Sequence, residues 1–173
     1  MIKKFELDLS TKITSFGIEL FRVKALISFG DVKKGDLGGY VEKEENLSHY
    51  GNAWVCSDAK VYGDAEVYGN AEVYGDAWVC GNAKVYDNAK VYGDAWVCGD
   101  AKISKLNDYI VFKNSWSSGR YFTYTRSNKM WRVGCFYDTG KELVKKAYQD
   151  SENSGKHYEV YVNLVKTLEK LEK

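Results

Sequence analysis

Apolar and polar positions repeat with a period of six in the middle of the chain. Residues 51–104 form nine consecutive hexads of the pattern [Gly/Ser/Asp]-[Asp/Asn]-Ala-x-[Val/Ile]-[Tyr/Cys/Ser]. Within each hexad, Ala and Val share one side of an alternating segment, while x and the Tyr or Cys share the other, which predicts a short strand with an inward face. Gly followed by Asp or Asn is turn chemistry, because these residues tolerate positive φ. The pattern therefore predicts a solenoid of short strands joined by tight corners.

The hexads are also consistent with three per turn, so that residue i stacks on residue i+18. Asn52, Asn70 and Asn88 then form one corner column. Asp58, Asp76 and Asp94 form a second, and Asp64, Asn82 and Asp100 a third. Fifty-four residues give three complete turns. We interpret the columns as corner residues, and the alternative is a ladder of cation ligands.

One outward face of the predicted solenoid is apolar. It carries Lys60, Trp78 and Trp96, beside Tyr62, Cys80 and Cys98. An exposed apolar strip on a rigid surface usually marks a contact. We expect subunit packing or coverage by the chain's own terminal segments, and a ligand or partner surface is the alternative. The stacked Cys80 and Cys98 are expected to be packed thiols rather than a disulfide or a metal pair.

These repeats resemble the hexapeptide-repeat family, whose members form triangular left-handed parallel β-helices with three hexads per turn. Val at the first family position and Ala at the fifth match, whereas Tyr or Cys at the second departs from the family pattern. The departure places bulk outside the coil and leaves the inward packing unaffected. The resemblance implies a left-handed β-helix over residues 51–104.

The segment before the repeats predicts strands at residues 5–9 and 18–29, followed by turn signals. A solenoid needs its ends closed, so residues 1–50 are expected to form an N-terminal cap and an irregular first coil. The stretches FGDV (29–32), KGDLGGYVE (34–42) and NLS (46–48), running into NAWV (52–55), resemble the lead-in of bacterial and phage hexapeptide-repeat proteins of poorly defined role.

Residues 105–173 predict a small α+β domain. Residues 109–113 favour a strand, and residues 120–126 and 130–137 favour a hairpin with aromatic faces. Thr139 with Glu142 is a capping box that opens a helix. Apolar residues then recur at helical spacing in a terminal amphipathic helix, at Tyr158, Tyr161, Val162, Val165 and Leu168. WRVGCF (131–136) and the helix start resemble the C-terminal domain of some phage hexapeptide-repeat proteins.

The expected fold class is thus mainly β: a short left-handed parallel β-helix with an N-terminal β cap and a small C-terminal α+β domain. Composition adds that the chain of 173 residues contains no proline and carries a net charge of only +1. By segment, the repeat holds four basic and eight acidic residues, and residues 105–173 hold thirteen and eight. The small net charge of the chain is therefore the sum of an acidic solenoid and a basic C-terminal domain.

The four cysteines form no CxxC pair, and the chain shows neither a secretory signal nor a membrane-spanning apolar run. We therefore expect a cytoplasmic location with reduced thiols, in the host cytoplasm if the protein is phage-encoded, and no membrane contact. With only His49 and His157 and an unsuitable cysteine spacing, we expect no metal and no cofactor.

The basic domain offers a candidate binding site on its predicted hairpin. Arg120, Arg126 and Arg132 are interleaved with Tyr124 and Trp131. Arginine beside aromatic rings can hold a phosphate and stack a base. Exposed charge around a small core is the alternative interpretation, and it is the commoner one.

Two function classes compete. Hexapeptide transferases generally use a His as general base, but here none lies within the repeat, and His49 falls in the register of an inward Val. We therefore expect a non-enzymatic binding protein of phage or prophage origin, a homo-oligomer (dimer or trimer) whose basic domain binds a host protein or protein complex, as a counter-defence inhibitor would. The alternatives are a hexapeptide-type acyltransferase and a nucleotide-binding sponge, with nucleotide or nucleic acid held by the C-terminal domain.

Overall fold

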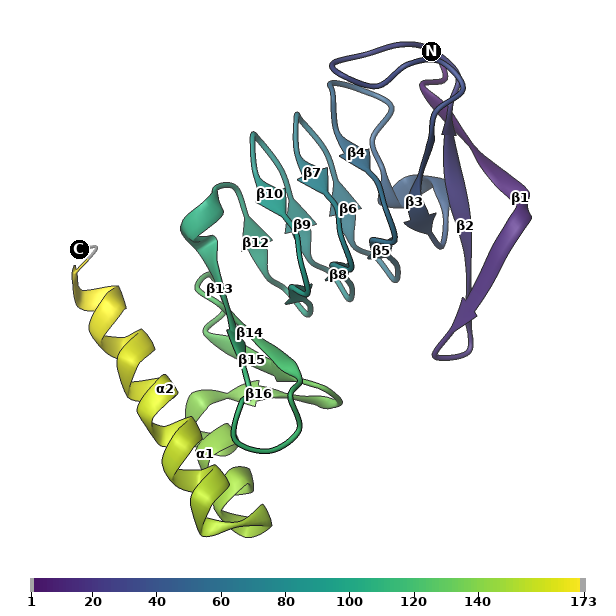
Figure 1. Ribbon diagram of the computed structural model, residues 1–173. Helices are drawn as coiled ribbons and strands as arrows, with labels where there is room; N and C mark the ends of the chain where they lie inside the picture. The colour runs from purple at the N-terminus through teal and green to yellow at the C-terminus, as the bar shows by residue number, and fades with distance from the viewer. Residues whose placement is uncertain (1, 172–173) are drawn as a thin grey trace. The chain divides into compact units, whose positions relative to one another are not determined.

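The computed structural model describes residues 2–171. The chain divides into two compact units: residues up to Ile110 together with Thr125–Asn128, and Val111–Tyr124 together with Lys129 onward. The first holds the N-terminal hairpin and the solenoid, and the second holds most of a small sheet and two helices (Figure 1).

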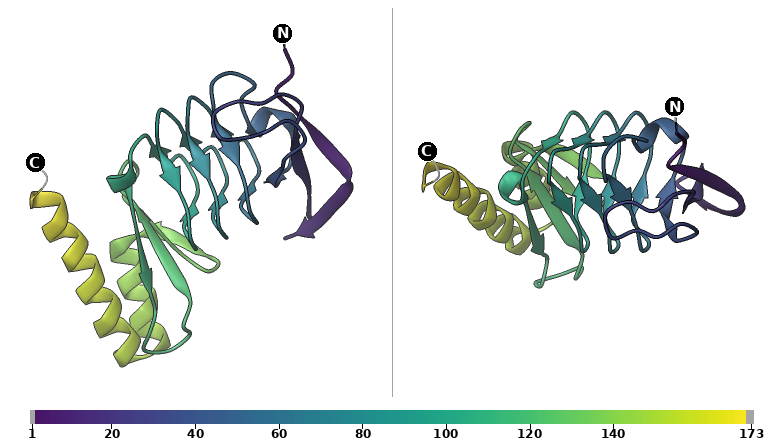
Figure 2. Two further views of the ribbon diagram at one scale, coloured as in Figure 1. Left: turned by 45° about the horizontal axis from the view of Figure 1, so that its top comes forward. Right: turned by 90° about the horizontal axis from the view of Figure 1, so that it is seen from above.

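An antiparallel hairpin begins the first unit. Strand β1 (Phe5–Ser15) pairs with β2 (Ile18–Ala25), which confirms the two strands predicted here, although the second ends earlier than expected. Strand β3 (Leu37–Val41) pairs antiparallel with β2 and parallel with β5 of the solenoid. The hairpin is therefore an extension of one solenoid face, at the N-terminal end of the coil (Figure 2).

Nine two-residue strands make the solenoid. They are β4 (Trp54–Val55), β5 (Lys60–Val61), β6 (Glu66–Val67), β7 (Glu72–Val73), β8 (Trp78–Val79), β9 (Lys84–Val85), β10 (Lys90–Val91), β11 (Trp96–Val97) and β12 (Lys102–Ile103). They stack as three parallel faces, β5-β8-β11, β4-β7-β10 and β6-β9-β12. Trp78 lies opposite both Lys60 and Trp96, so the register of eighteen residues is confirmed.

The solenoid begins earlier than the hexads do. Val41 of β3 lies opposite Val61, and Leu47 bridges to Val67, each at a separation of twenty residues rather than eighteen. The corner that contains His49 is therefore two residues longer than the later corners. Leu47, only 1% exposed, fills the inward position. The prediction that His49 occupies an inward register was wrong, because the longer corner shifts it out of phase.

The inward side chains form a continuous apolar core. Every hexad Ala and every hexad Val or Ile is no more than 1% exposed. Backbone bonds join each coil to the next, as in Trp78 N–H to Ala95 O at 2.8 Å. Such a coil buries its apolar side only when a neighbour stacks on it, so the two ends need separate protection.

Side chains supply that protection at the N-terminal end. In later coils the carbonyls at the Gly and Ala positions of a corner accept N–H groups from the preceding coil. At the start of the coil, the buried Lys4 Nζ donates to Gly51 O at 3.3 Å and Ala53 O at 2.8 Å. Asn46 Nδ2 donates in the same way to the carbonyls of Gly63 and Ala65, at 3.0 and 2.8 Å.

The C-terminal end of the solenoid is closed by a 3₁₀ turn (Leu106–Asp108) and Tyr109. Tyr109 lies eighteen residues after Val91, where a further strand would continue the face. Its hydroxyl donates to Lys90 O at 3.1 Å and accepts from Tyr92 N–H at 3.4 Å. Ser127 Oγ accepts from Lys102 N–H at 2.7 Å. Side-chain oxygens thus take the place of hydrogen-bond partners that a further coil would supply. The other 3₁₀ turn (Glu44–Asn46) lies near the N-terminal end of the solenoid.

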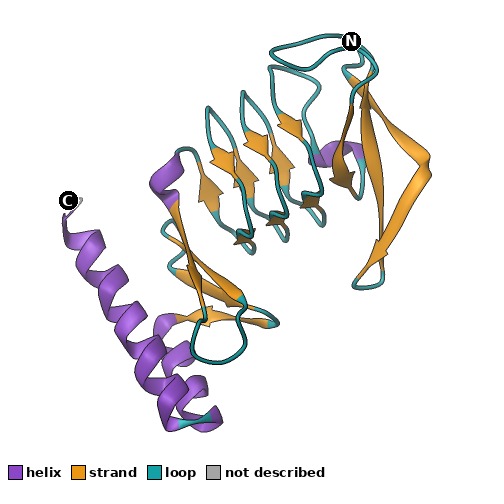
Figure 3. Ribbon diagram, viewed as in Figure 1, coloured by secondary structure: helices purple, strands orange, loops and turns teal. Residues whose placement is uncertain are grey.

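A four-stranded sheet in the order β13-β14-β15-β16 and two helices follow (Figure 3). The strands are β13 (Tyr109–Lys113), β14 (Tyr121–Thr125), β15 (Met130–Val133) and β16 (Phe136–Thr139), and the helices are α1 (Gly140–Asp150) and α2 (Glu152–Leu171). Thr139 caps α1 by accepting Glu142 N–H at 3.5 Å, as predicted. Residues 130–137 are not one strand, because Gly134, with φ of 56°, turns the chain between β15 and β16.

An aromatic cluster forms the core of the second unit. Phe122 lies 5.3 Å from Tyr158 and 5.3 Å from Tyr161 between ring centroids, and 6.1 Å from Trp131. Phe122 and Trp131 are 1% and 2% exposed. The sheet contributes Phe122 and Trp131 while α2 contributes the tyrosines, so the core depends on residues far apart in the sequence.

Candidate functional site

The aromatic residues of the proposed arginine–aromatic site lie in the core. Tyr124 and Trp131 are 3% and 2% exposed, and their rings are 5.0 Å apart. The Tyr124 hydroxyl donates to the Glu169 carboxylate of α2. Little of either ring is therefore open for a base to stack on, but both residues line the pocket described below, and their role in binding stays a prediction.

The three arginines of that site are divided between the two units. Arg126 belongs to the first unit, where its backbone N–H donates to Asp108 O and its Nε donates to Asn107 O. Arg120 and Arg132 belong to the second unit. Because side chains alternate along a strand, Arg132 lies on the face of the sheet opposite to Trp131. Alternation therefore divides Arg132 from Trp131, and joint binding by the three arginines stays a prediction.

The second unit instead contains a pocket of about 350 Å³ that gathers lysines. We call it the lysine pocket, because Lys129, Lys141 and Lys166 line it. Its walls also include Thr139 and Gly140 at the start of α1, and Val162 and Val165 of α2. Lys129 directly precedes β15, Lys141 is the second residue of α1 and Lys166 lies on α2. No local motif connects these three positions, so the sequence pattern identified only Tyr124 and Trp131 among the residues that line the pocket.

The electrostatics of the lysine pocket favour an anion. Three lysines line it against a single carboxylate, Glu169, which already accepts the Tyr124 hydroxyl. The N-terminus of α1 adds partial positive charge at Gly140 and Lys141. The α1 helix has eleven residues, long enough for its aligned peptide dipoles to contribute. The pocket could therefore hold a carboxylate or a phosphate by charge and hydrogen bonding.

The predicted apolar face of the solenoid is present, and part of it touches the chain's own hairpin. The ring centroids of Trp78 and Trp96 lie 5.4 Å apart with the rings tilted by 42°, Tyr62 lies 5.9 Å from Trp78, and the Lys60 ammonium lies 4.8 Å from the same ring. Phe16, at the tip of the β1–β2 hairpin, lies 5.4 Å from Trp78 and 6.0 Å from Trp96. An N-terminal residue therefore contacts the tryptophan pair, while subunit packing at this face stays a prediction.

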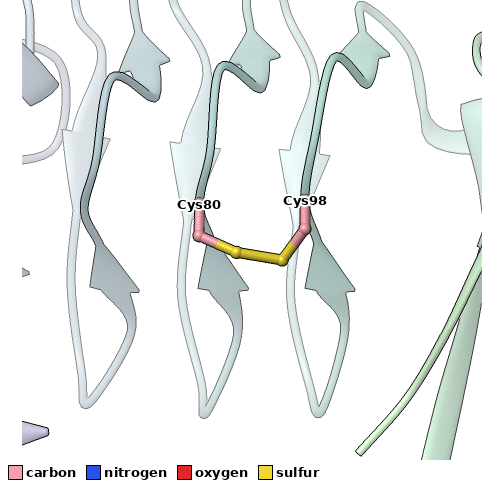
Figure 4. The surroundings of a disulfide bond; sticks show 2 residues. All are labelled: Cys80 and Cys98. Atoms are coloured by element: carbon pink, nitrogen blue, oxygen red, sulfur yellow. A yellow bond between two sulfur atoms is a disulfide. The ribbon is translucent and has the colours of Figure 1, made fainter. Parts of the chain in front are cut away.

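Cys80 and Cys98 form a disulfide, with their Cα atoms 4.6 Å apart (Figure 4). The expectation of packed thiols was wrong. The eighteen-residue register stacks the two side chains on adjacent coils, which brings the sulfurs within bonding reach. Cys56 and Cys135 remain free. Because disulfides persist mainly in oxidising compartments, this bond weighs against the reduced thiols that the composition predicted.

A groove of about 630 Å³ runs beside another corner column of the solenoid. Asn52, Asn70 and Asn88 line one side, and Asn70 Nδ2 donates to Asn88 Oδ1 at 3.2 Å. Glu72 and Lys90 pair at 3.1 Å on its floor. The column is therefore joined by amide hydrogen bonds, which agrees with its interpretation as corner residues. Two pairs of its polar side chains, Asn70 with Asn88 and Glu72 with Lys90, are thus bonded to one another.

Both histidines are engaged in structural contacts. His49 Nδ1 accepts from Lys4 N–H at 3.1 Å, its Nε2 lies 2.6 Å from Glu44 Oε1, and its ring stacks on Phe5. Hydrogen bonding to His49 holds the pKa of the Glu44 carboxyl below its usual range. His157 stacks on Trp116 at 4.5 Å, and its Nδ1 lies 2.8 Å from Asn153 O. His49 thus belongs to the cap, as a packing residue with satisfied partners.

Among residues 2–171, no group of three or more His, Cys, Asp or Glu side chains is arranged to hold a metal ion. Over the same residues, no helix combines the length and the apolar composition needed to cross a membrane.

Comparison with known proteins gives one match within the solenoid. Residues 83–99 match the family model described as the YdcK beta solenoid repeat. No curated protein matches the chain. The matched residues cover the end of one coil and most of the next. The match and the stacked coils together establish a repeat β-solenoid as the central architecture of this chain.

Proposed function

We propose that this protein is a non-enzymatic binding protein in which the solenoid is a rigid support and the lysine pocket binds an acidic surface of a host protein or protein complex. In this proposal the protein is of phage or prophage origin and acts as a counter-defence inhibitor in the host cytoplasm, and the Cys80–Cys98 disulfide is the one observation that weighs against that compartment. It works there as a homo-oligomer, a dimer or a trimer. The phage origin is supported by the resemblance of the lead-in and tail segments.

The observation that carries the proposal is the charge of the lysine pocket. Three lysines line a pocket whose one carboxylate accepts a tyrosine hydroxyl, and the first residues of α1 line it too. Basic clusters of this kind attract acidic partners and accelerate their encounter. The proposal thus keeps the basic domain as the recognition element and moves the contact from the arginine hairpin to Lys129, Lys141 and Lys166.

The contacts of the histidines favour a binding role over the acyltransferase alternative. A general base must be free to accept a proton from a substrate. His49 has both ring nitrogens engaged by Lys4 and Glu44, and its side chain is 10% exposed. A role as a general base would require breaking contacts that close the end of the solenoid.

A second candidate function, the nucleotide sponge, is supported by the same pocket. A helix N-terminus combined with lysines is a recurrent phosphate-binding arrangement. The pocket volume of about 350 Å³ is near the lower end of the range for small-molecule sites. Tyr124 and Trp131 line the pocket but are only 3% and 2% exposed, so little ring surface is available to stack a base, which favours the protein partner over the nucleotide.

The test is affinity capture from bacterial host lysate, followed by mass spectrometry, with the wild-type protein and two charge-reversed variants. Lys129→Glu/Lys141→Glu/Lys166→Glu reverses the lysine pocket. Lys145→Glu/Lys146→Glu/Lys156→Glu is the matched control, since these lysines are exposed on the same unit and do not line the pocket.

We expect one host protein or complex to be captured by the wild type and the control and lost with the pocket variant. Capture that survives reversal of the pocket would overturn the assignment of the site. Calorimetric titration with nucleotides separates the candidates: pocket-dependent nucleotide binding without a captured protein would favour the sponge. Turnover of acetyl-CoA by the purified protein would instead revive the transferase.

A further inference from the structure

The groove beside the column of Asn52, Asn70 and Asn88 belongs entirely to the first unit, and we call it the asparagine groove. Its volume of about 630 Å³ lies within the range of small-molecule sites. The loop of residues 29–37 forms one wall, and three successive coils of the solenoid supply the rest. A Cβ placed on Gly30 of that loop would lie 3.6 Å from Asn52 Cβ. The loop therefore packs against the Asn52 end of the column, while Asn70 and Asn88 stay exposed.

The apolar lining of the asparagine groove comes from the loop and from the first of the three coils. Phe29 and Trp54 meet edge to face, with their ring centroids 5.3 Å apart. Trp54 is only 6% exposed, so this ring pair is mainly a packing contact. The open apolar surface is supplied by Leu37, which is 53% exposed, and by the half-buried Val32. A ligand in the groove therefore meets aliphatic carbon on the loop side.

The second and third coils contribute only polar side chains to the lining, namely Asn70, Glu72, Asn88 and Lys90. Asn70 Nδ2 donates to Asn88 Oδ1 at 3.2 Å, and Asn70 Oδ1 accepts Asn52 N–H at 3.4 Å. A side-chain amide has two donor hydrogens and two acceptor lone pairs, so both residues keep bonding capacity. Within residues 2–171, Asn88 Nδ2 donates to no protein group. The column therefore offers donors and acceptors to a ligand.

The charges of the asparagine groove favour a neutral ligand. Asp31, Asp36 and Glu72 line it against a single ammonium, Lys90, so a phosphate or carboxylate ligand would be repelled. Glu72 is held by Lys90 through both carboxylate oxygens, at 3.1 and 3.2 Å, and Asp36 Oδ2 accepts Lys33 N–H at 2.8 Å. These partners reduce the negative charge left for a cation, and amide N–H groups bind acceptors rather than cations.

We propose that the asparagine groove binds a short neutral saccharide. Sugar hydroxyls donate and accept, as the amides of Asn70 and Asn88 require, and the C–H face of a sugar ring matches the aliphatic surface of Leu37 and Val32. Successive coils lie about 4.8 Å apart, close to the spacing of hydroxyls on alternate carbons of a six-membered sugar ring. Groups on one side of an extended peptide recur at about 6.6 Å, which does not match the column.

This inference goes beyond the proposed function and does not depend on it. The asparagine groove belongs to the first unit, whereas the lysine pocket belongs to the second. Saccharide binding by the purified chain tests the groove alone, and capture from lysate tests the lysine pocket. Failure of one is therefore distinguishable from failure of the other.

The test is a glycan array probed with the full chain, followed by calorimetric titration with the glycans that retain it. The array carries neutral oligosaccharides of hexoses and N-acetylhexosamines, together with sialylated and sulfated glycans. We expect retention on neutral glycans only, with a dissociation constant between about 10 µM and 1 mM, as a small ligand held by a few hydrogen bonds would show. Retention on no neutral glycan, or on anionic glycans as strongly as on neutral ones, would overturn the proposal.

An exchange of amide for carboxylate locates the site. Asn88→Asp should weaken saccharide binding about fivefold to tenfold, because it removes both donor hydrogens of the exposed amide. Aspartate occupies the same hexad position at Asp76 and Asp94, so the corner should keep its shape. Asn82→Asp is the matched control, since it makes the same change at a corner that does not line the groove.

Binding by Asn82→Asp should equal that of the wild type, and thermal unfolding followed by circular dichroism checks that both variants are folded. A second variant, Leu37→Ser, should weaken binding about threefold, because it removes aliphatic surface from the loop side. Saccharide binding that tolerates Asn88→Asp, or that falls equally with Asn82→Asp, would overturn the assignment of the groove.

Discussion

The solenoid and the C-terminal unit bury their apolar residues in opposite ways. In the solenoid, small identical side chains stack on neighbours eighteen residues away, and each coil repeats the last. In the C-terminal unit, a few large aromatic rings from distant segments meet in one cluster around Phe122. The first arrangement gives a regular support, and the second creates irregular surfaces where unlike segments converge. The lysine pocket lies in the second, where a loop, α1 and α2 meet.

The largest expected effect comes from breaking the aromatic cluster. Trp131→Ala should lower the free energy of unfolding by about 3–5 kcal/mol, because it removes a fully buried ring that touches both sheet and helix. Val79→Ala in the solenoid should cost about 2 kcal/mol, because fewer buried atoms are lost. Urea denaturation followed by tryptophan fluorescence and circular dichroism measures both. If Trp131→Ala and Val79→Ala lowered the free energy of unfolding equally, the expected difference between the aromatic cluster and the solenoid core would be contradicted.

Removing the coil-to-coil disulfide should weaken the solenoid by about 3 kcal/mol, as loop-closure entropy predicts for a separation of eighteen residues. The variant is Cys80→Ser/Cys98→Ser, and Cys56→Ser is the control. Thermal unfolding with and without reductant is the measurement. Alkylation of the non-reduced, denatured protein should modify only Cys56 and Cys135. Modification of all four cysteines without reductant would show that the bond is absent.

The cap of the solenoid should make stability depend on pH. Burial lowers the pKa of Lys4 from 10.5 to about 8. Between these values the unfolded chain binds more protons than the folded one, so the free energy of unfolding rises with pH. We expect a gain of about 2 kcal/mol between pH 7 and 9.5, below the range in which Tyr109, with a pKa raised to about 12, acts in the opposite direction.

Lys4→Met removes the titrating group and should abolish the gain, while Lys3→Met, at an exposed neighbour, should retain it. Chemical denaturation at a series of pH values gives the comparison. An identical slope in the wild type and Lys4→Met would assign the pH dependence to another group.

The smallest effect concerns the corners at which the repeat departs from glycine. Asp87 has a φ of 57° in a position that is glycine in most hexads. Asp87→Gly should raise the free energy of unfolding by about 1 kcal/mol, because it relieves a left-handed backbone on a residue with a Cβ. Asp87→Ala keeps the Cβ and should give no such gain. A stabilisation by Ala as large as that by Gly would show that backbone strain is not the cause.

The sequence predicted the periodic part of the fold and missed most of the site, for physical reasons. The eighteen-residue register follows from alternation and corner chemistry, which are local. The position of His49 outside the inward register could be predicted only by knowing that its corner is two residues longer than the others. Strand alternation predicts that the sheet has two faces, one of which carries Tyr124 and Trp131. It does not predict that the helices cover that face. Only tertiary packing brings together Lys129, Lys141 and Lys166. The eighteen-residue register predicted that Cys80 and Cys98 lie close together, but it did not predict whether they are oxidised to a disulfide.

The most direct test of the division between support and recognition is hydrogen exchange of the complex with the captured host partner. We predict slower exchange, relative to the free protein, in residues 129–141 and 162–169 around the lysine pocket, and unchanged exchange across the solenoid strands β4–β12. Protection concentrated in the solenoid, along the groove of Asn52, Asn70 and Asn88, with no change around the lysine pocket, would contradict the account.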